Sequence, residues 1–378
     1  MTSCVSGFMP DTLFACRKQS GAKSGPHHQI RTSLPDCIAD GPPKDSGHVH
    51  DWVNNIEGTG MWAAPLFTLV FLVASFLMIW RLNAMTEYGF EGTAVGTLVM
   101  PYCSGLANLI FVVVMGQRGG ASEEVLTNAI VNNATNLTLL IGLPALLWGM
   151  HVIPSKRAKK READQHRLNR LSLALTIIAA GFFAGVLWAL TRDGRVDFFD
   201  GLVLVGLFAF WQCLHVIEVL KHNVRQKRSL NPIRLMVDFA AVGVGAWALY
   251  VSIDWLVAWI STSNGSFVNA SRLGWLSGWL MVAPNGMLAL YYGWRNRADI
   301  VYSSQVGDGH ICIPLGVGIF ALFAPINVTP RLQEGVVLLA AAAVVHLLFV
   351  SVLGRMPRWM GVVLVAAYGW FLYRGLVE

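Results

Sequence analysis

The amino-acid sequence predicts an all-α integral membrane protein with about ten transmembrane helices, arranged as two inverted five-helix repeats. Apolar residues make up 54% of the chain and charged residues 13%, against roughly 45–50% and 25% in soluble globular proteins. Between short basic segments lie apolar stretches of roughly 20 residues, the length at which a helix crosses a ~30 Å hydrocarbon core. A polar pattern in the third predicted span also recurs in the eighth, which predicts the duplication.

The ten spans occupy almost all of the chain from Trp62 to Arg374. They begin near Trp62, Gly92, Val125, Leu171, Phe198, Leu235, Leu273, Ile300, Gly335 and Trp359. Residues 1–60 are rich in Gly, Pro, Ser, His and Cys and show no amphipathic period, so we expect a disordered tail outside the cytoplasm. The basic connection around Arg225 separates a first five-helix half, residues 61–222, from a second, residues 223–378.

Positive charge is unevenly distributed between the connections. The odd-numbered connections contain Arg81, Lys156, Arg157, Lys159, Lys160, Arg161, Arg167, Arg170, Lys221, Arg225, Lys227, Arg228, Arg234, Arg295, Arg297, Arg355 and Arg358, and the even-numbered ones only Arg118, Arg192, Arg195, Arg272 and Arg331. Because cytoplasmic loops are enriched in Lys and Arg, the odd connections are predicted to be cytoplasmic and both termini to lie outside. The basic excess is then an orientation signal in a plasma membrane or bacterial inner membrane, and no nucleic-acid partner is expected.

Matching polar residues occur at nearly the same spacing in the two halves. Asn108 precedes Asn132 by 24 residues, and Asn285 precedes Asp308 by 23. The third span contains Val-Asn-Asn-Ala-Thr-Asn at 131–136, followed by Gly142, and the eighth contains Gly-Asp-Gly-His-Ile-Cys at 307–312, followed by Gly318. Five is an odd number of spans, so a duplicated five-helix unit is inverted in its second copy, as in many secondary transporters.

These segments resemble the paired repeats of the sodium/calcium exchanger (cation/calcium antiporter) superfamily. Each family repeat has a Thr-Ser-Leu-Pro-Glu-like segment and, about 23 residues later, a Gly-Ser-Asn-Ile-x-Asn-like segment. The matching residues in this chain are Asn133, Asn136 and Gly142 in the first repeat, and Pro284, Arg297, Asp299, Gly307 and Gly318 in the second. The resemblance covers residues 62–374 and implies a secondary active cation antiporter with no enzymatic activity.

The chain departs from the family pattern at its charged positions. The glutamate that follows the proline in each family repeat and coordinates the cation is replaced by Asn108 and Asn285. Gly309 and Cys312 replace the Asn pair of the second repeat. Calcium favours about six to eight oxygen ligands, several of them carboxylates, so the loss of two negative charges leaves a divalent ion poorly neutralised. The charge favours a monovalent ion or a proton on at least one side of the exchange.

We therefore expect a site centred on Asp308, the carboxylate that the repeat alignment puts at membrane mid-depth. The candidate cation ligands are Asn108, Asn132, Asn133, Asn136, Asn285 and Asp308. Asn132 and Asn136 share a helix face with Asn128, because they are four residues apart. The structural alternative is that each Asn only hydrogen-bonds to a neighbouring helix. His310 is two residues from Asp308, points elsewhere, and is expected to be a packed core residue.

Three functions remain open on these grounds. The first is a cation antiporter working by alternating access, whose transported cation is Na⁺, H⁺ or Ca²⁺ and which needs no cofactor. The second is a ten-span metabolite carrier, which would have a roomier, more aromatic cavity and no ion dependence. The third is a degenerate relative that acts as a membrane scaffold or sensor, which the missing glutamates keep open. The expected partners are inorganic cations and lipid, and the oligomeric state does not follow from the sequence.

Overall fold

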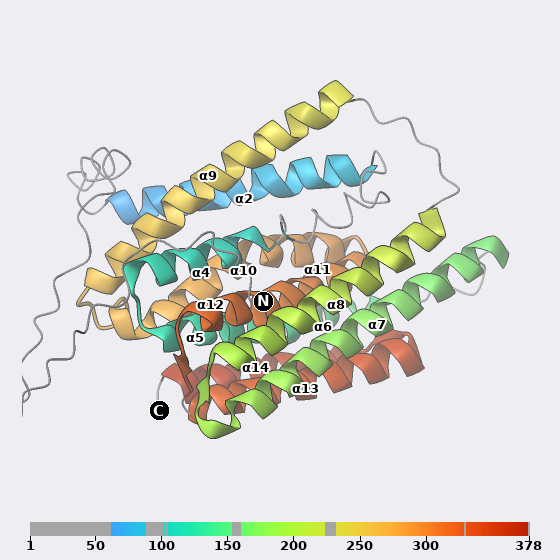
Figure 1. The fold of residues 1–378 in the computed structure, drawn as a ribbon. Coiled ribbons are helices and arrows are strands. Elements are labelled where there is room, and N and C mark those ends of the chain that lie inside the picture. Colours follow the sequence, from blue (N-terminus) through green and yellow to red (C-terminus); the bar gives the residue numbers. More distant parts are fainter. Residues whose placement is uncertain are drawn as a thin grey trace, which may run out of the picture. The chain divides into compact units, whose positions relative to one another are not determined.

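The computed structural model describes residues 62–87, 102, 105–152, 160–223, 232–328 and 330–376 (Figure 1). All of them belong to the structural unit His50–Glu378. The predicted tail 1–60, most of the predicted beginning of the second span, and Cys103 lie outside the described residues.

Long helices account for nearly all of the described chain (Figure 1). Within it, nine helical stretches are long and apolar enough to cross a membrane, and the shorter apolar helix Leu106–Arg118 belongs to the second predicted span. The spans in chain order are α2 (Ala63–Glu87), α4 (Leu106–Arg118), α5 to α6 (Ser122–Trp148), α7 (Lys160–Leu190), α8 (Phe198–Asn223), α9 (Pro232–Thr262), α10 (Leu273–Trp294), α11 to α12 (Ala298–Phe323), α13 (Pro330–Leu348) and α14 (Arg358–Leu376). The chain is thus an all-α multi-pass membrane protein, and the predicted ten-helix plan is confirmed.

The third and eighth spans share an interruption. In the third span, α5 (Ser122–Ala134) passes into a π-helical segment η2 (Thr135–Leu140) and then α6 (Ile141–Trp148). In the eighth, α11 (Ala298–Ile311) passes into the π-helical segment η5 (Cys312–Val317) and then α12 (Gly318–Phe323). π-helical turns are rare in proteins, and those that occur often lie at functional sites. Both segments begin within one turn of the polar motifs, so the duplication extends to the backbone geometry.

Two short β-pairs show that the second half is inverted. β1 (Met150–His151), after the third span, pairs with β4 (Arg355–Met356), before the tenth. β2 (Arg195–Val196), before the fifth span, pairs with β3 (Ile326–Asn327), after the eighth. β1 in the first half is equivalent to β3 in the second, and β2 is equivalent to β4, so the two pairs are equivalent to each other. The first pair joins odd connections and the second joins even ones, so equivalent pairs lie on opposite sides of the membrane.

Glycines allow close approach at two helix crossings that are equivalent in the two halves. A methyl group at Gly361 of α14 would lie 2.7 Å from Gly142 O in α6, and one at Gly201 of α8 would lie 2.8 Å from Gly318 O in α12. Gly142 and Gly318 are the residues that the sequence motifs paired. Small residues at such crossings let membrane helices pack without an intervening side chain.

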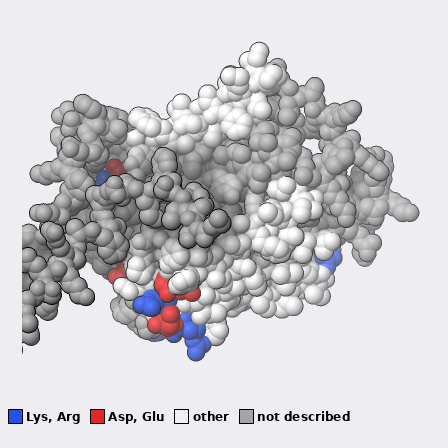
Figure 2. All heavy atoms as spheres, viewed as in Figure 1, with Lys and Arg blue, Asp and Glu red and all other residues white. Residues whose placement is uncertain are grey.

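The third and eighth spans are the most deeply buried of the nine long described spans. α2 and α9 lie side by side and reach the others mainly through α4 and α10 (Figure 1). On the face drawn in Figure 2 the described charged side chains gather near the helix ends, and the described residues between them are uncharged. That distribution suits a molecule whose middle faces lipid.

Candidate cation-binding site

Asp308, on α11, is at the centre of a buried polar cluster. Its side chain has 6% of its surface exposed, and its Oδ2 atom accepts hydrogen bonds from Asn136 Nδ2 at 3.0 Å and Asn285 Nδ2 at 3.3 Å. Asn136 belongs to the first half and Asn285 to the second, so the carboxylate lies where the halves meet. Among the described residues no Lys or Arg forms an ion pair with Asp308. Its negative charge is therefore available to a cation or a proton.

The first half contributes a chain of amides that ends at this carboxylate. Asn136 Nδ2 also donates to Asn132 Oδ1 at 3.0 Å, and Asn132 Nδ2 donates to Asn108 Oδ1 at 3.2 Å. Cys312 Sγ donates to the same Asn132 oxygen at 3.8 Å. Five of the six predicted ligands, Asn108, Asn132, Asn136, Asn285 and Asp308, thus form one connected cluster. The two spacings of 24 and 23 residues each correspond to a direct hydrogen bond.

Asn133, the sixth predicted ligand, lies beside this cluster. Its Nδ2 donates to Ala129 O of its own helix at 2.7 Å, and its Oδ1 occupies the space where a side chain on Gly309 would stand. One residue along an α-helix is a rotation of about 100°, so Asn133 faces α11 at the point where the two helices cross. Gly309 makes room for it, which gives a steric reason for the glycine at that position.

Gln305 also belongs to this cluster, although it is not among the predicted ligands. It lies one turn before Asp308 on α11 and is fully buried. Its Nε2 donates to Asn285 O at 3.4 Å and to Ser304 Oγ at 2.9 Å. Among the described residues its Oε1 has no hydrogen-bond donor, and neither has Asn136 Oδ1. Two buried carbonyl oxygens without donors are suited to a cation.

The polar face of α5 continues away from Asp308 through Asn128 and Glu124. Asn128 Nδ2 donates to Ser277 Oγ of α10 at 2.9 Å. Glu124 is buried, with 7% of its surface exposed, and its Oε2 accepts from Gly274 N at 2.5 Å. A carboxylate at the first turn of α10 satisfies a free backbone N–H. The sequence analysis missed Glu124, although its spacing of four residues from Asn128 was a usable signal.

Two buried histidines hold helices together outside the cluster. His310 is placed within hydrogen-bonding distance of Thr176 O on α7, at 2.9 Å, and lies against Phe183 and Trp211. His346 on α13 is 2.7 Å from Leu137 O in η2. His310 is thus the packed core residue that was predicted, and it faces away from Asp308.

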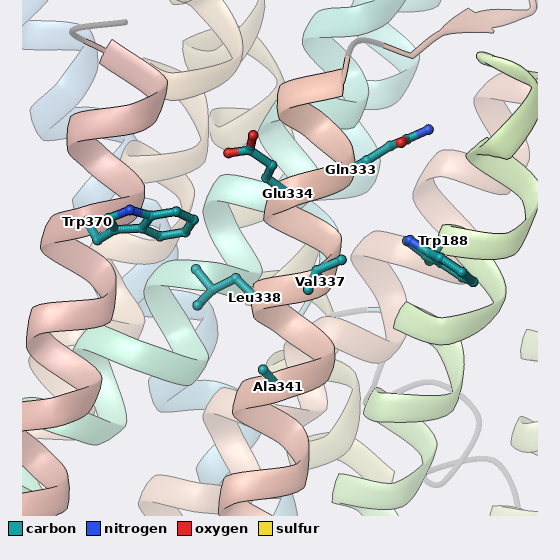
Figure 3. A pocket seen from close by; sticks show the side chains of 7 residues that line it. All are labelled: Trp188, Gln333, Glu334, Val337, Leu338, Ala341 and Trp370. Atoms are coloured by element: carbon teal, nitrogen blue, oxygen red, sulfur yellow. The ribbon is translucent and has the colours of Figure 1, made fainter.

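Three other acidic residues of the described spans, Asp238, Asp254 and Glu334, have ion-pair partners of their own. Asp238 pairs with Arg81 at 3.3 Å and Asp254 with Arg118 at 2.7 Å. A groove between α7, α13 and α14 is lined by Trp188, Gln333, Glu334, Val337, Leu338, Ala341 and Trp370 (Figure 3). Glu334 in this groove pairs with Arg374 at 2.9 Å. These carboxylates are already neutralised.

The cluster around Asp308 is therefore rich in amides and poor in charge. Among the described residues no group of three His, Cys, Asp or Glu side chains could hold a metal ion together. One carboxylate with several amide oxygens is a hard donor set that favours oxygen-seeking cations. Its single charge balances a monovalent ion or a proton.

A protein-family comparison gives an independent result for both halves. The family model described as "Sodium/calcium exchanger protein" matches residues 59–216 and 237–376. The two matched segments leave out the basic connection between the fifth and sixth spans. No match was found among curated proteins.

Solved structures of the sodium-calcium exchanger NCX_Mj have a similar fold. The form soaked with zero Na⁺ and Ca²⁺ is 18% identical, with a TM-score of 0.53 over 83% of this chain and 97% of that one. The form soaked with 10 mM Na⁺ and zero Ca²⁺ is 17% identical, with a TM-score of 0.56 over 83% and 98%. The form with 2.5 mM Na⁺ and 10 mM Sr²⁺ is 18% identical, with a TM-score of 0.55 over 83% and 97%. At these identities the likeness concerns the fold.

Proposed function

The chain belongs to the sodium/calcium exchanger protein family, a family of transporters, and on this premise we propose that it is a cation antiporter whose transport site is centred on Asp308. The observation that supports this most directly is the contact between Asn136 of the first half and Asp308 of the second, at 3.0 Å. A carboxylate held between two inverted halves is reached from one side or the other as the halves move. This is the geometry of alternating access.

The charge of the site favours a monovalent cation or a proton on at least one side of the exchange. Asn108 and Asn285, where the family resemblance implies glutamates, both hydrogen-bond within the cluster as neutral amides. With Asp308 as its single carboxylate, the site balances one positive charge. A divalent ion would retain an uncompensated charge in a low-dielectric environment, which is strongly unfavourable.

Orientation in the membrane follows from the same topology. We propose that the side with β1 and β4 is cytoplasmic and that both termini lie outside, because the odd connections carry most of the Lys and Arg. A single cysteine introduced at His151 should react with an impermeant maleimide only after the membrane is opened. One introduced at Arg195 should react in intact cells. The reverse pattern would overturn the orientation and leave the transport site untouched.

The proposed function is tested by flux in proteoliposomes with imposed Na⁺, K⁺, Ca²⁺ and H⁺ gradients. The wild type is compared with Asp308→Asn and with Asp254→Asn, a matched control that removes a span carboxylate already paired with Arg118. We expect cation-coupled flux in the wild type and in the control, and its loss in Asp308→Asn.

Three other outcomes separate the alternatives. Flux that survives Asp308→Asn would retain the antiporter but move its site elsewhere. Cation-independent uptake of an organic solute would favour the metabolite carrier. No flux with any ion, from protein shown to be folded, would favour the scaffold or sensor.

A further inference from the structure

Gln305 lies beside the two residues of the second half that form the site, Asn285 and Asp308. It is fully buried on α11 and three residues before Asp308, so that both project from the same helix face. It also reaches α10, because its Nε2 donates to the backbone oxygen of Asn285 at 3.4 Å. The Asn285 side chain in turn donates to Asp308 at 3.3 Å. Gln305 is therefore linked to the carboxylate through a single residue, Asn285.

Its amide orientation is fixed by its neighbours. Asn285 O can only accept, so the nitrogen of Gln305 must face it, and Ser304 Oγ at 2.9 Å takes the same nitrogen. Reversing the amide would put two carbonyl oxygens against each other. Oε1 is consequently the free end of the group, and it is a buried oxygen with no donor in the part of the chain that the structure describes.

A purely structural role for the Gln305 amide explains the bonds of its nitrogen but not the lack of a donor at its oxygen. The Nε2 bond joins α11 to α10, as expected for an amide that holds membrane helices together. A buried acceptor left without a partner costs about 1–3 kcal/mol, and structural packing supplies no compensation for it. Asn136 Oδ1, on the facing span, is a second buried oxygen in the same condition. Two such oxygens in a cluster with one carboxylate suggest a shared positively charged ligand.

We propose that Gln305 Oε1 is a direct ligand of the transported cation and that its neutral amide, beside the single charge of Asp308, makes the site selective for monovalent over divalent ions. The inference rests on the proposed function and adds to it a specificity-determining residue. A glutamate at this position would have nearly the same size and the same oxygen. It would raise the charge of the site to two, the charge that a divalent ion needs.

The test uses the full-length protein in proteoliposomes, with ²²Na⁺ uptake as the probe and Ca²⁺ as competitor. The variants are Gln305→Met, Gln305→Glu and Asp308→Asn, and Gln333→Met is the matched control. Gln333 lines the groove of Figure 3 and donates to Thr191 O at 2.8 Å, so this control loses the same kind of amide outside the Asp308 cluster.

We expect Gln305→Met to raise the KM for Na⁺ about tenfold with little change in kcat, since one ligand is lost. Gln305→Glu should lower the Ca²⁺ concentration that halves Na⁺ uptake by about tenfold or more. Gln333→Met should behave as the wild type. If Gln305 only positioned Asn285 through Nε2, Gln305→Glu would weaken Na⁺ uptake without sharpening Ca²⁺ competition, which would overturn the proposal.

The outcomes distinguish this inference from the proposed function. Loss of uptake in Asp308→Asn, with KM and Ca²⁺ competition unchanged in both Gln305 variants, would overturn the role of Gln305 alone. Unchanged uptake in Asp308→Asn, or no uptake by the folded wild type, would overturn the proposed function and this inference with it. If Gln305→Met fails to fold, Gln305→Glu decides by its Ca²⁺ competition.

Discussion

The two halves of the molecule share their architecture but differ in the chemistry they bring to the site. Each half has a span with a π-helical segment, a close glycine crossing and one strand of each β-pair. The first half contributes the neutral amides Asn108, Asn132 and Asn136. The second contributes Asn285 and the carboxylate of Asp308. Symmetry of fold is thus combined with asymmetry of charge.

This difference separates what the fold requires from what the ligand requires. Helix crossings are set by the volume of the side chains between them, which is the same problem in both halves. Charge in the membrane interior is costly wherever it lies, so one carboxylate serves a site that both halves enclose. The comparison predicts that transport requires one carboxylate in the site but tolerates that carboxylate in either half.

The strongest test moves the charge to the other half. Asp308→Asn should lower cation flux roughly 100-fold or more, because a ligand interaction of about 3 kcal/mol is removed. Adding Asn132→Asp should restore flux to within about tenfold of the wild type, since Asn132 and Asp308 both lie 3.0 Å from Asn136 Nδ2. Flux assays on the single and double variants measure this. A double variant no better than Asp308→Asn would show that the asymmetry itself is functional.

The second test compares the glycine crossings. Gly201→Ala and Gly361→Ala should each destabilise the protein by about 1–3 kcal/mol, because the added methyl group meets a backbone oxygen of the neighbouring span. Gly206→Ala on α8 and Gly369→Ala on α14 are matched controls, since their methyl groups would meet open space. Thermal unfolding in detergent measures all four. Unequal effects of the two crossing variants would show that the structural symmetry is only approximate in energy.

Much of this comparison could be predicted from the sequence. Hydropathy located the ten spans because a lipid-crossing helix must be long and apolar. The matching spacings from Asn108 to Asn132 and from Asn285 to Asp308 predicted the duplication, and in the structure each spacing corresponds to a direct hydrogen bond. That Asn133 faces Gly309 of α11 could not be predicted from the spacing alone, because it depends on where the two helices cross.

Two further residues were missed for a related reason. The role of Gln305 depends on the orientation of its amide, which the carbonyl of Asn285 on another helix determines. Glu124 accepts from Gly274 N, and the two residues are 150 positions apart in the chain. Spacing could place Glu124 on the helix face of Asn128, but it could not identify the partner, because a contact between distant parts of the chain leaves no local pattern.

The third test compares the equivalent amides Asn285 and Asn108. Asn285 donates directly to Asp308, whereas Asn108 contacts only Asn132 among the predicted ligands. We expect Asn285→Leu to raise the KM for the transported cation about tenfold and Asn108→Leu about threefold, because a hydrogen bond to a charged group is worth more than one between amides. Flux measured against cation concentration gives both values. A larger effect at Asn108 would place the cation nearer the first half.

The smallest expected effect concerns an ion pair outside the site, to which we assign a structural role only. Asp254 on α9 pairs with Arg118 on α4, and 22% of its side chain is exposed. Partly exposed ion pairs contribute about 0–1 kcal/mol, so Asp254→Asn should lower the thermal unfolding temperature by no more than a few degrees and leave the KM unchanged. Because this pair is screened by salt, the small loss of stability should shrink as NaCl is raised during unfolding. An altered KM at constant stability would assign a second carboxylate to transport, and the site would then no longer be limited to one negative charge.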